Sequence, residues 1–307
     1  MHRRISIRTL PIGDRDTASS RIRCFRLMEF LPDGFDVRPL VEVLEDGDTD
    51  FDVLYVQKAA YPYVVEMCRN ALELGIKVLY DIDDPFGLYH GMSEEEMCAV
   101  ATAVTVDTEE RAAVVREVAA GPVHVVPDAL DYLDEPRRNG RVPPRPKSLV
   151  TFGNVESLSA TSPFMGEVPA PYQKAYIGRP AGQIDDCEYV EWNLDTFIDE
   201  LARFDLALLV HADDDAGKAK SNNRLLVAMS AGVPTLVSDT AAYAETVREV
   251  GFGFLVCRGP EDVPRALREL EDPALRQEIV DTCRDYVWSR YDPRFVSGEF
   301  ARIVQEL

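Results

Sequence analysis

The sequence lacks long apolar runs and has little positive charge. None of its 307 residues belongs to an apolar stretch approaching the ~20 residues needed to cross a bilayer. It has 33 Lys and Arg against 54 Asp and Glu, a formal net charge of -21. Because this charge repels nucleic acid and anionic membranes on average, we expect neither as a partner. The first residues, MHRRISIRTLPIG, carry early positive charge without an apolar core and cleavage site, which indicates a strand rather than a signal peptide.

Cysteine and histidine are too scattered to predict a metal site or a disulfide framework. The six cysteines include no CxxC pair and do not cluster with the four histidines. We interpret them as reduced thiols of a cytoplasmic protein. The sequence also has no GxSxG, P-loop or HExxH pattern, and its loop GDRDTASS is not a GxGxxG dinucleotide motif. We therefore expect no cofactor and no metal.

Apolar strands alternate with amphipathic helices through both halves of the chain. FDVLYVQK (51–58) and IKVLYDIDD (76–84) read as strands, and the helical stretch between them ends at Gly75. Alternation of this kind predicts parallel sheets in an α/β fold. The stretch EPRRNGRVPPRPK (135–147) is rich in Pro, Gly and Arg and has no apolar periodicity, so it predicts a linker.

We predict two Rossmann-like doubly wound domains that face a cleft. The first spans residues 1–134, the linker 135–147 and the second domain 148–285, with helices over 286–307 that return to the first domain. Ligands of open α/β sheets bind outside the carboxyl ends of the strands. The stretches predicted to lie at such ends are Gly13–Ser20, Asp81–Asp84, Pro127–Asp131, Gly153–Asn154 and His211–Asn223.

One stretch, KAKSNNRLLVAMSAGVPTLVSD (218–239), predicts an anion site. It places Lys218, Lys220 and Arg224 around the start of a helix, with Ser221 or Asn222 as the N-cap. The unpaired N–H groups and partial positive charge of a helix N-terminus bind phosphate groups. The alternative reading is that the lysines only balance the nearby acidic run 213–215.

This stretch resembles the donor-binding segment of bacterial glycosyltransferases with the two-domain GT-B fold. The pattern is that of the KSNxR subset of family 4-like or family 1-type enzymes, which reads K-S-N-x-[KR]-x-x-E. VLYDIDDP (78–85) resembles the D-x-D-D strand end of that subset, and VTVD…VHVVPDALD (104–131) resembles the close of its N-terminal domain. The resemblance covers most of the chain. It implies a glycosyltransferase (hexosyl- or related) that moves a sugar from a nucleotide-sugar donor to an unknown acceptor (glycan, lipid-linked or small molecule), without a metal and with retention suggested.

Three residues depart from the family pattern. Val227 stands where the family has a Glu that hydrogen-bonds the ribose, Ala219 stands at the position of an earlier Glu, and Asp128 replaces the usual Asn. Two alternatives therefore stay open: a non-catalytic GT-B-like binding protein with an eroded donor site, and a sugar-nucleotide epimerase.

The resemblance and the expected strand ends together assign candidate roles. The candidate donor-binding residues are Gly153, Asn154, Lys218, Lys220, Ser221, Asn222, Arg224 and Val227. The candidate catalytic residues are Asp83, Asp84 and His211, and the candidate acceptor-binding residues are Gly13, Arg21 and Arg23. Asp81 and Asp83 form a DxD pattern, but its place in the N-terminal half argues against a metal held at the donor diphosphate. Arg21 and Arg23 read almost equally well as a solvated helix face, and a lone histidine is more often structural.

Overall fold

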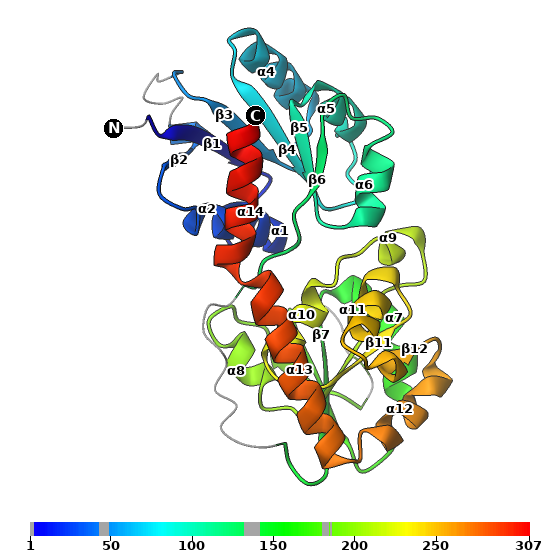
Figure 1. Cartoon of the computed structure of the whole chain (residues 1–307). Helices are drawn as coiled ribbons and strands as arrows, with labels where there is room; N and C mark the ends of the chain where they lie inside the picture. The colour runs from blue at the N-terminus through cyan, green and yellow to red at the C-terminus, as the bar shows by residue number, and fades with distance from the viewer. Residues whose placement is uncertain (1–2, 43–48, 132–141, 180–183, 185) are drawn as a thin grey trace. The chain divides into compact units, whose positions relative to one another are not determined.

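The structure, a computed structural model, describes residues 3–42, 49–131, 142–179, 184 and 186–307 (Figure 1). The chain forms two compact units, Met1–Asp131 with Tyr291–Leu307 and Tyr132–Arg290, so it passes twice between them. In the described part of the chain, no helix combines the length and apolar character that crossing a bilayer requires.

The first unit contains a parallel sheet of six strands in the order β2-β1-β3-β4-β5-β6. Its strands are β1 (Ile5–Pro11), β2 (Phe35–Pro39), β3 (Val53–Gln57), β4 (Lys77–Ile82), β5 (Ala103–Val106) and β6 (Val123–Val125). Every residue of β3 is buried, which explains its unbroken apolar run between charged ends. The described helices are α1 (Ala18–Ser20), the π-helix η1 (Arg21–Arg26), α2 (Leu27–Glu29), α4 (Pro62–Glu73), α5 (Glu94–Val100), α6 (Glu109–Val115) and α14 (Pro293–Glu306).

Two apolar clusters hold this sheet between helices. One cluster includes residues of α4, α5 and α6, and the other includes α2 and α14 (Figure 1). Phe300 of α14 meets Tyr55 of β3 edge-on, with ring centroids 5.1 Å apart. Local signals set helix ends. As predicted, α4 stops before Gly75, whose φ of +84° favours glycine, and the Thr108 hydroxyl caps α6 by accepting from Arg111 N.

The second unit contains another parallel six-stranded sheet, in the order β12-β11-β10-β7-β8-β9. Its strands are β7 (Ser148–Phe152), β8 (Gln173–Gly178), β9 (Glu188–Glu191), β10 (Leu206–Leu209), β11 (Thr235–Ser238) and β12 (Val256–Cys257). Its described helices are α7 (Val155–Gly166), α8 (Phe197–Leu201), α9 (Asp215–Lys218), α10 (Asn223–Ser230), α11 (Ala241–Glu249), η2 (Gly253–Leu255), η3 (Pro260–Asp262), α12 (Val263–Glu269) and α13 (Pro273–Tyr291).

Part of the predicted linker 135–147 lies outside the described residues, which resume at 142. From there the chain is anchored on the second unit, because Val142 N donates to Gln277 Oε1 and Pro143 O accepts from the buried Arg276. The predicted C-terminal helices divide between the units: α13 packs in the second, and α14 belongs to the first.

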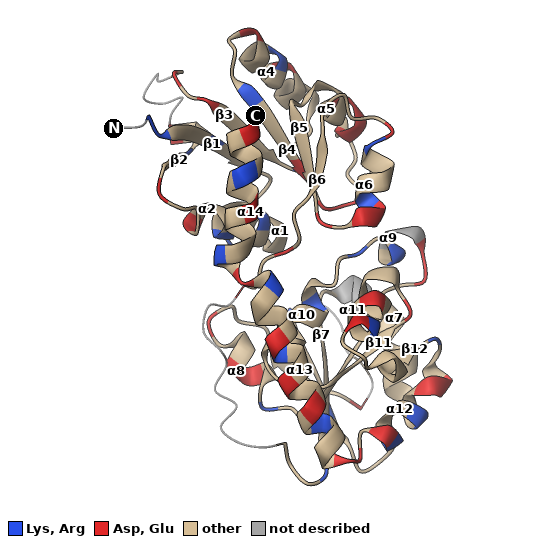
Figure 2. Cartoon of the chain, viewed as in Figure 1, with Lys and Arg blue, Asp and Glu red and all other residues tan. Residues whose placement is uncertain are grey.

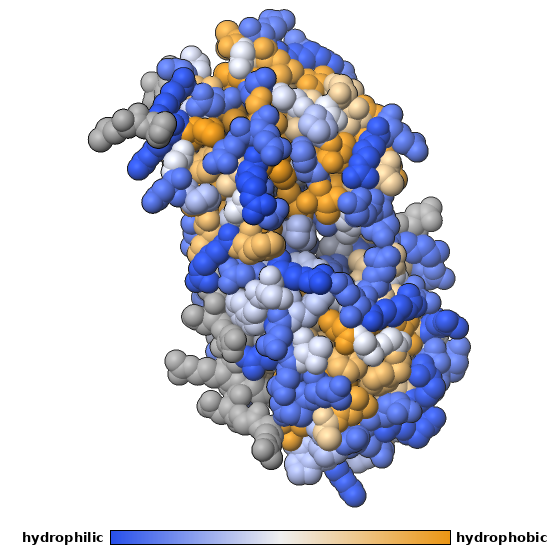
Figure 3. Space-filling view, viewed as in Figure 1, coloured by the Kyte–Doolittle hydropathy of each residue, from blue (hydrophilic) through white to orange (hydrophobic). Residues whose placement is uncertain are grey.

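Both sheets are doubly wound, as predicted. In the first sheet the strand order reverses between β1 and β3, and in the second it reverses between β7 and β10. The crevice at such a reversal, outside the carboxyl ends of the strands, is where α/β sheets bind ligands. Charged residues of both signs lie on both units, and on the face in Figure 3 the apolar residues appear only in scattered patches (Figures 2 and 3).

Candidate functional site

Arg224 occupies the reversal point of the second sheet. From the first turn of α10 its guanidinium donates to the carbonyl of Phe152, the last residue of β7, and to that of Val210, which follows β10, each at 3.0 Å. A third bond joins it to His211 Nδ1 at 2.9 Å. Arg224 therefore links the ends of β7 and β10, the two strands between which the strand order reverses. It also holds His211, which the sequence predicted as a site residue, beside α10.

His211 is held neutral. Burial lowers its pKa to about 2, and the positive charges of Arg224 and Lys220 add to this, while the backbone of Ser221 opposes it. Because Arg224 donates to Nδ1, the ring proton sits on Nε2. Nε2 is buried, and the ring stacks on Tyr243 with centroids 4.4 Å apart. The neutral imidazole therefore carries its only N–H on Nε2, where the backbone of Ser221 is the group that raises the pKa.

The N-cap residue of α10 does not cap the helix with its side chain, and the nearest substitute is a long hydrogen bond of 3.5 Å from Asn223 N to Ser221 Oγ. Asn222 is the N-cap residue, but its Nδ2 donates to Thr246 Oγ1 at 2.9 Å instead of its oxygen capping the helix. The adjacent Asn223 Nδ2 is also buried without a partner among the described residues. Ser221 and Lys220 precede this end and are half-buried. A weakly capped helix end flanked by lysine suits an anion.

Lys218 does not join this group. The structure contains a short helix, α9, that the sequence did not predict, and Lys218 is its last residue. Its Nζ pairs with Asp213 Oδ1 at 2.9 Å, and both side chains are mostly exposed. For Lys218 the alternative reading, a charge balanced across a loop, is the better description.

Gly153, Asn154 and Val227 take different places around α10. Gly153 directly follows β7, with a φ of +148° that favours glycine and a carbonyl that accepts from Tyr176 Oη at 2.9 Å. Asn154 comes next and is exposed. Val227 is only 4% exposed within α10. Its side chain packs in the core. The expectation that Val227 lines a ribose site is therefore not supported, because such a role needs an exposed side chain.

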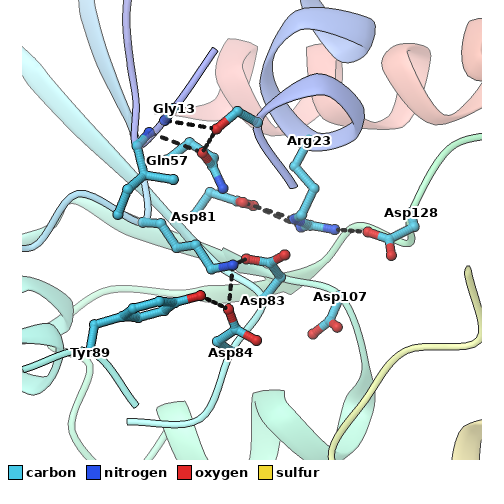
Figure 4. A network of polar contacts seen from close by, with 12 residues as sticks. Gly13, Arg23, Gln57, Asp81, Asp83, Asp84, Tyr89, Asp107 and Asp128 are labelled. Atoms are coloured by element: carbon cyan, nitrogen blue, oxygen red, sulfur yellow. Dashed lines mark hydrogen bonds and ion pairs between the residues drawn. The ribbon is translucent and has the colours of Figure 1, made fainter. Parts of the chain in front are cut away.

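In the first unit, Gln57 lies at the sheet reversal between β1 and β3. Its Oε1 accepts from Ser20 Oγ at 2.9 Å and from Ile12 N at 3.2 Å, and Ser20 Oγ accepts from Gly13 N at 3.0 Å. Figure 4 shows the amide oxygen turned toward Gly13 and the nitrogen on the opposite side, toward Asp81. This Nε2 is buried without a partner among the described residues. Sequence reasoning found Gly13 but missed Gln57, whose only signal was a polar residue ending a buried strand.

Lys58 joins Asp83 and Asp84 beside Gln57. Its Nζ lies 2.9 Å from Asp83 Oδ1 and also pairs with Asp84, whose Oδ2 accepts from Tyr89 Oη at 2.7 Å. Lys58 has a φ of +65°, a costly conformation for a non-glycine residue that is found most often at functional sites. Burial raises the pKa of Asp83, although Lys58 and Arg23 oppose it. The two carboxylates predicted as catalytic are thus brought together.

The two arginines predicted to contact an acceptor are instead buried ion-pair partners. Arg23 is 1% exposed and grips Asp81 through two bonds of 2.7 and 2.8 Å, while its Nη1 donates to Asp128 at 2.9 Å. Arg21 pairs with Asp131 at 2.8 Å. Neither lies on a solvated helix face, which was the alternative interpretation of these two arginines from the sequence. Asp128, unusual for the family pattern, has its reason here as a partner of Arg23.

Asp81 and Asp83 do not form a metal-binding pair. Asp81 turns to Arg23 and Thr105, whereas Asp83 turns to Lys58 (Figure 4). Within the described ranges, no three His, Cys, Asp or Glu side chains are grouped so that they could hold a metal ion.

Asp107, which directly follows β5, is a further acidic residue of this site that sequence reasoning missed. It is 6% exposed and accepts from Arg111 Nε at 2.7 Å. Burial raises its pKa to about 7, against the attraction of Arg111 and with repulsion from Asp128. Perturbed carboxyls of this kind gather at functional sites. Its one sequence signal was its place after the apolar strand AVTV.

Comparisons with known proteins support the fold. No family profile and no curated protein matches the chain. Among solved structures, the Anabaena protein HepE in complex with UDP aligns with a TM-score of 0.70 at 10% identity, over 99% of this chain and 100% of HepE. WaaG, a glycosyltransferase involved in lipopolysaccharide biosynthesis, aligns with a TM-score of 0.61 at 14% identity, over 98% of this chain and 99% of WaaG. A trehalose-6-phosphate structure from E. coli bound with UDP-2-fluoro glucose aligns with a TM-score of 0.61 at 12% identity, over 87% and 76% of the two chains.

This chain has the GT-B fold. At these identities the likeness concerns the fold alone. The chain spans 57% of the matched chain of the GtfA/B complex.

In this GT-B chain the predicted site residues fall into two groups. The second unit gathers Lys220, Ser221, Asn222, Arg224 and His211 around the start of α10. The first unit gathers Asp83 and Asp84 with Lys58. The structure adds Gln57, Asp107 and Tyr243, and it places Lys218, Val227 and Arg23 outside the expected roles.

Proposed function

We propose that the protein is a glycosyltransferase that uses a nucleotide-sugar donor bound at the second unit. The observation that carries the proposal is the weakly capped N-terminus of α10 beside Arg224 at the sheet reversal. HepE and the E. coli structure, which share the fold, contain UDP and a UDP-sugar. A cytoplasmic location stays a prediction.

The donor diphosphate would bind at the start of α10. The helix dipole and Lys220 supply positive charge there, and neutral His211 adds no charge of its own. When the bond between the sugar carbon and the diphosphate oxygen breaks, these groups stabilise the growing negative charge on the leaving group without a metal.

The acceptor hydroxyl would bind at the first unit, where its oxygen forms the new bond to the sugar carbon. Its proton would pass to a carboxylate of Asp83 or Asp84. The raised pKa of Asp83 brings its basicity closer to that of a useful base at neutral pH. Retention of the anomeric configuration belongs to the proposal only as the resemblance suggests it.

Two lysines near α10 provide a matched test of donor binding. Calorimetric titrations of UDP, GDP and ADP into the wild-type protein, with EDTA present and again with Mg²⁺, identify the preferred diphosphate. Lys220→Ala should weaken that binding by about 1.5–3 kcal/mol, the size of a charged hydrogen bond. Lys218→Ala, whose lysine pairs with exposed Asp213, should change it little.

The outcomes separate the alternatives. If the two lysine variants weaken nucleoside diphosphate binding equally, the start of α10 is not the donor site. If the diphosphate binds only when Mg²⁺ is present, the proposal of metal-independent transfer is contradicted. Nucleoside diphosphate release from the matching sugar nucleotide that needs an added acceptor supports transfer. No release at all would favour a non-catalytic protein, and acceptor-free isomerisation would favour an epimerase.

A further inference from the structure

The cations buried in the polar site of the first unit are paired with carboxylates. Four buried cations each lie 2.7–2.9 Å from a carboxylate. They are Arg21, Arg23, Lys58 and Arg111, and the carboxylates around them are Asp81, Asp83, Asp84, Asp107, Asp128 and Asp131. Because burial raises the pKa of Asp83 and of Asp107, the six acidic groups outnumber the four cations fully once these two are ionised, and the site is then negative. A ligand with its own negative charge would therefore be repelled, since every one of these cations is already paired.

Gln57 points to a ligand that offers an oxygen lone pair. The residue is 0% exposed, and its Oε1 is held by Ser20 and Ile12, so the amide cannot turn over without losing both bonds. Its Nε2 is left as a buried donor without a described partner, on the side of Asp81 (Figure 4). Such an orphaned donor at a sheet reversal fits a hydroxyl or ether oxygen.

Tyr89 adds an apolar surface beside the carboxylates. Its hydroxyl is fixed by Asp84, its ring centroid lies 5.5 Å from Lys58 Nζ, and 37% of the residue stays exposed. Neighbouring Leu88 is 46% exposed. A sugar ring combines what these groups require, because it has hydroxyls that donate to carboxylates, oxygens that accept from an amide, and a C–H face that packs on an aromatic ring.

We propose that the site formed by Gln57, Asp83, Asp84, Tyr89 and Asp107 binds an acceptor sugar that carries no negative charge, a neutral or amine-bearing sugar rather than a sugar phosphate or uronic acid. The inference rests on the proposed function, since it treats this site as the acceptor site. It goes further than the proposed function because it excludes negatively charged acceptors.

The test uses matched probes and the full chain. Methyl glycosides of common hexoses, the corresponding amino sugars, the 6-phosphates and the uronic acids are titrated at pH 8, with saturating nucleoside diphosphate, and followed by ligand-observed NMR. We expect binding among neutral or amino sugars, and at least tenfold weaker binding of each anionic counterpart. Tighter or equal binding of the anionic sugars would overturn the proposal, and so would the absence of binding by every probe.

Two variants tie the result to the site. Gln57→Glu keeps the oxygen that Ser20 and Ile12 contact but replaces the donor by an acidic group, so neutral sugars should bind at least tenfold more weakly. If that variant unfolds, Asp107→Asn serves instead: it removes one negative charge and should narrow the gap between neutral and anionic sugars several-fold. An unchanged gap would count against the charge argument. Nucleoside diphosphate binding is measured in every sample. If the wild-type protein does not bind it, the donor site is refuted. If the protein binds it but no sugar behaves as expected, only the acceptor inference fails.

Discussion

Replacing Arg23 by Met should destabilise the first unit strongly. The substitution keeps an unbranched apolar stem but removes a guanidinium that makes four bonds to Asp81, Asp128 and Val126 O. Asp81 is 0% exposed, so losing its cation leaves a buried charge that solvent does not reach. Removing one partner of a buried ion pair costs about 3–5 kcal/mol. That is a large share of the roughly 5–15 kcal/mol by which a domain is stable.

Urea unfolding can assign this loss to one unit. Both tryptophans of the chain, Trp192 and Trp288, lie in the second unit. Fluorescence therefore reports the second unit, whereas far-ultraviolet circular dichroism reports both. With a urea dependence of about 1–3 kcal/mol per M, Arg23→Met should move part of the circular dichroism transition down by one to a few molar urea while the fluorescence midpoint moves much less.

The matched control is Arg69→Met in the same unit. Arg69 pairs with Glu66 and Glu96 at the surface, where solvent screens such pairs, so this substitution should change stability little. If Arg23→Met lost no more stability than Arg69→Met, the buried network would not hold the strand ends together. The double variant Arg23→Met with Asp81→Leu should recover part of the loss, since it removes the stranded carboxylate as well as its partner.

Three further outcomes follow from burial. Val227→Glu should cost several kcal/mol and lower the melting temperature far more than Val227→Ala, because it buries an unpaired carboxylate; a stable variant that binds nucleoside diphosphate more tightly would restore the ribose role. The folded pKa of Asp107, about 7, lies above its unfolded value, so its contribution to stability is present at low pH and is lost as pH rises from about 4 to 7; wild-type stability relative to Asp107→Asn should fall over that range and then level, and parallel profiles would contradict the shift. The His211 ring should show no NMR titration between pH 5 and 8, and a midpoint in that range would mean that Arg224 does not donate to Nδ1.

The sequence by itself determined the class of fold and the local start of the candidate donor site. Alternation of apolar strands and amphipathic helices predicts parallel sheets because both signals are local and regular. The helix that became α10 was also readable, since its buried residues Leu225, Leu226, Ala228 and Met229 follow helical spacing and Gly232 ends it with a φ of +69°. The exposed or buried state of the polar residues around it was not readable in the same way.

Only the tertiary structure decided which polar groups meet. Arg23 finds Asp81 58 residues away and Asp128 105 residues away, and Gln57 finds Ser20 37 residues away. Sequence spacing shows which face of a strand or helix a residue occupies, but not which strand ends become neighbours. The arginines predicted as acceptor contacts therefore form ion pairs with buried carboxylates. Gln57 and Asp107, which carried almost no signal in the sequence, lie at the carboxyl ends of the inner strands β3 and β5. Which polar side chains pair across neighbouring strands, and which buried donor or carboxyl is left without water or a partner, is decided only when the strands take their order in the sheet.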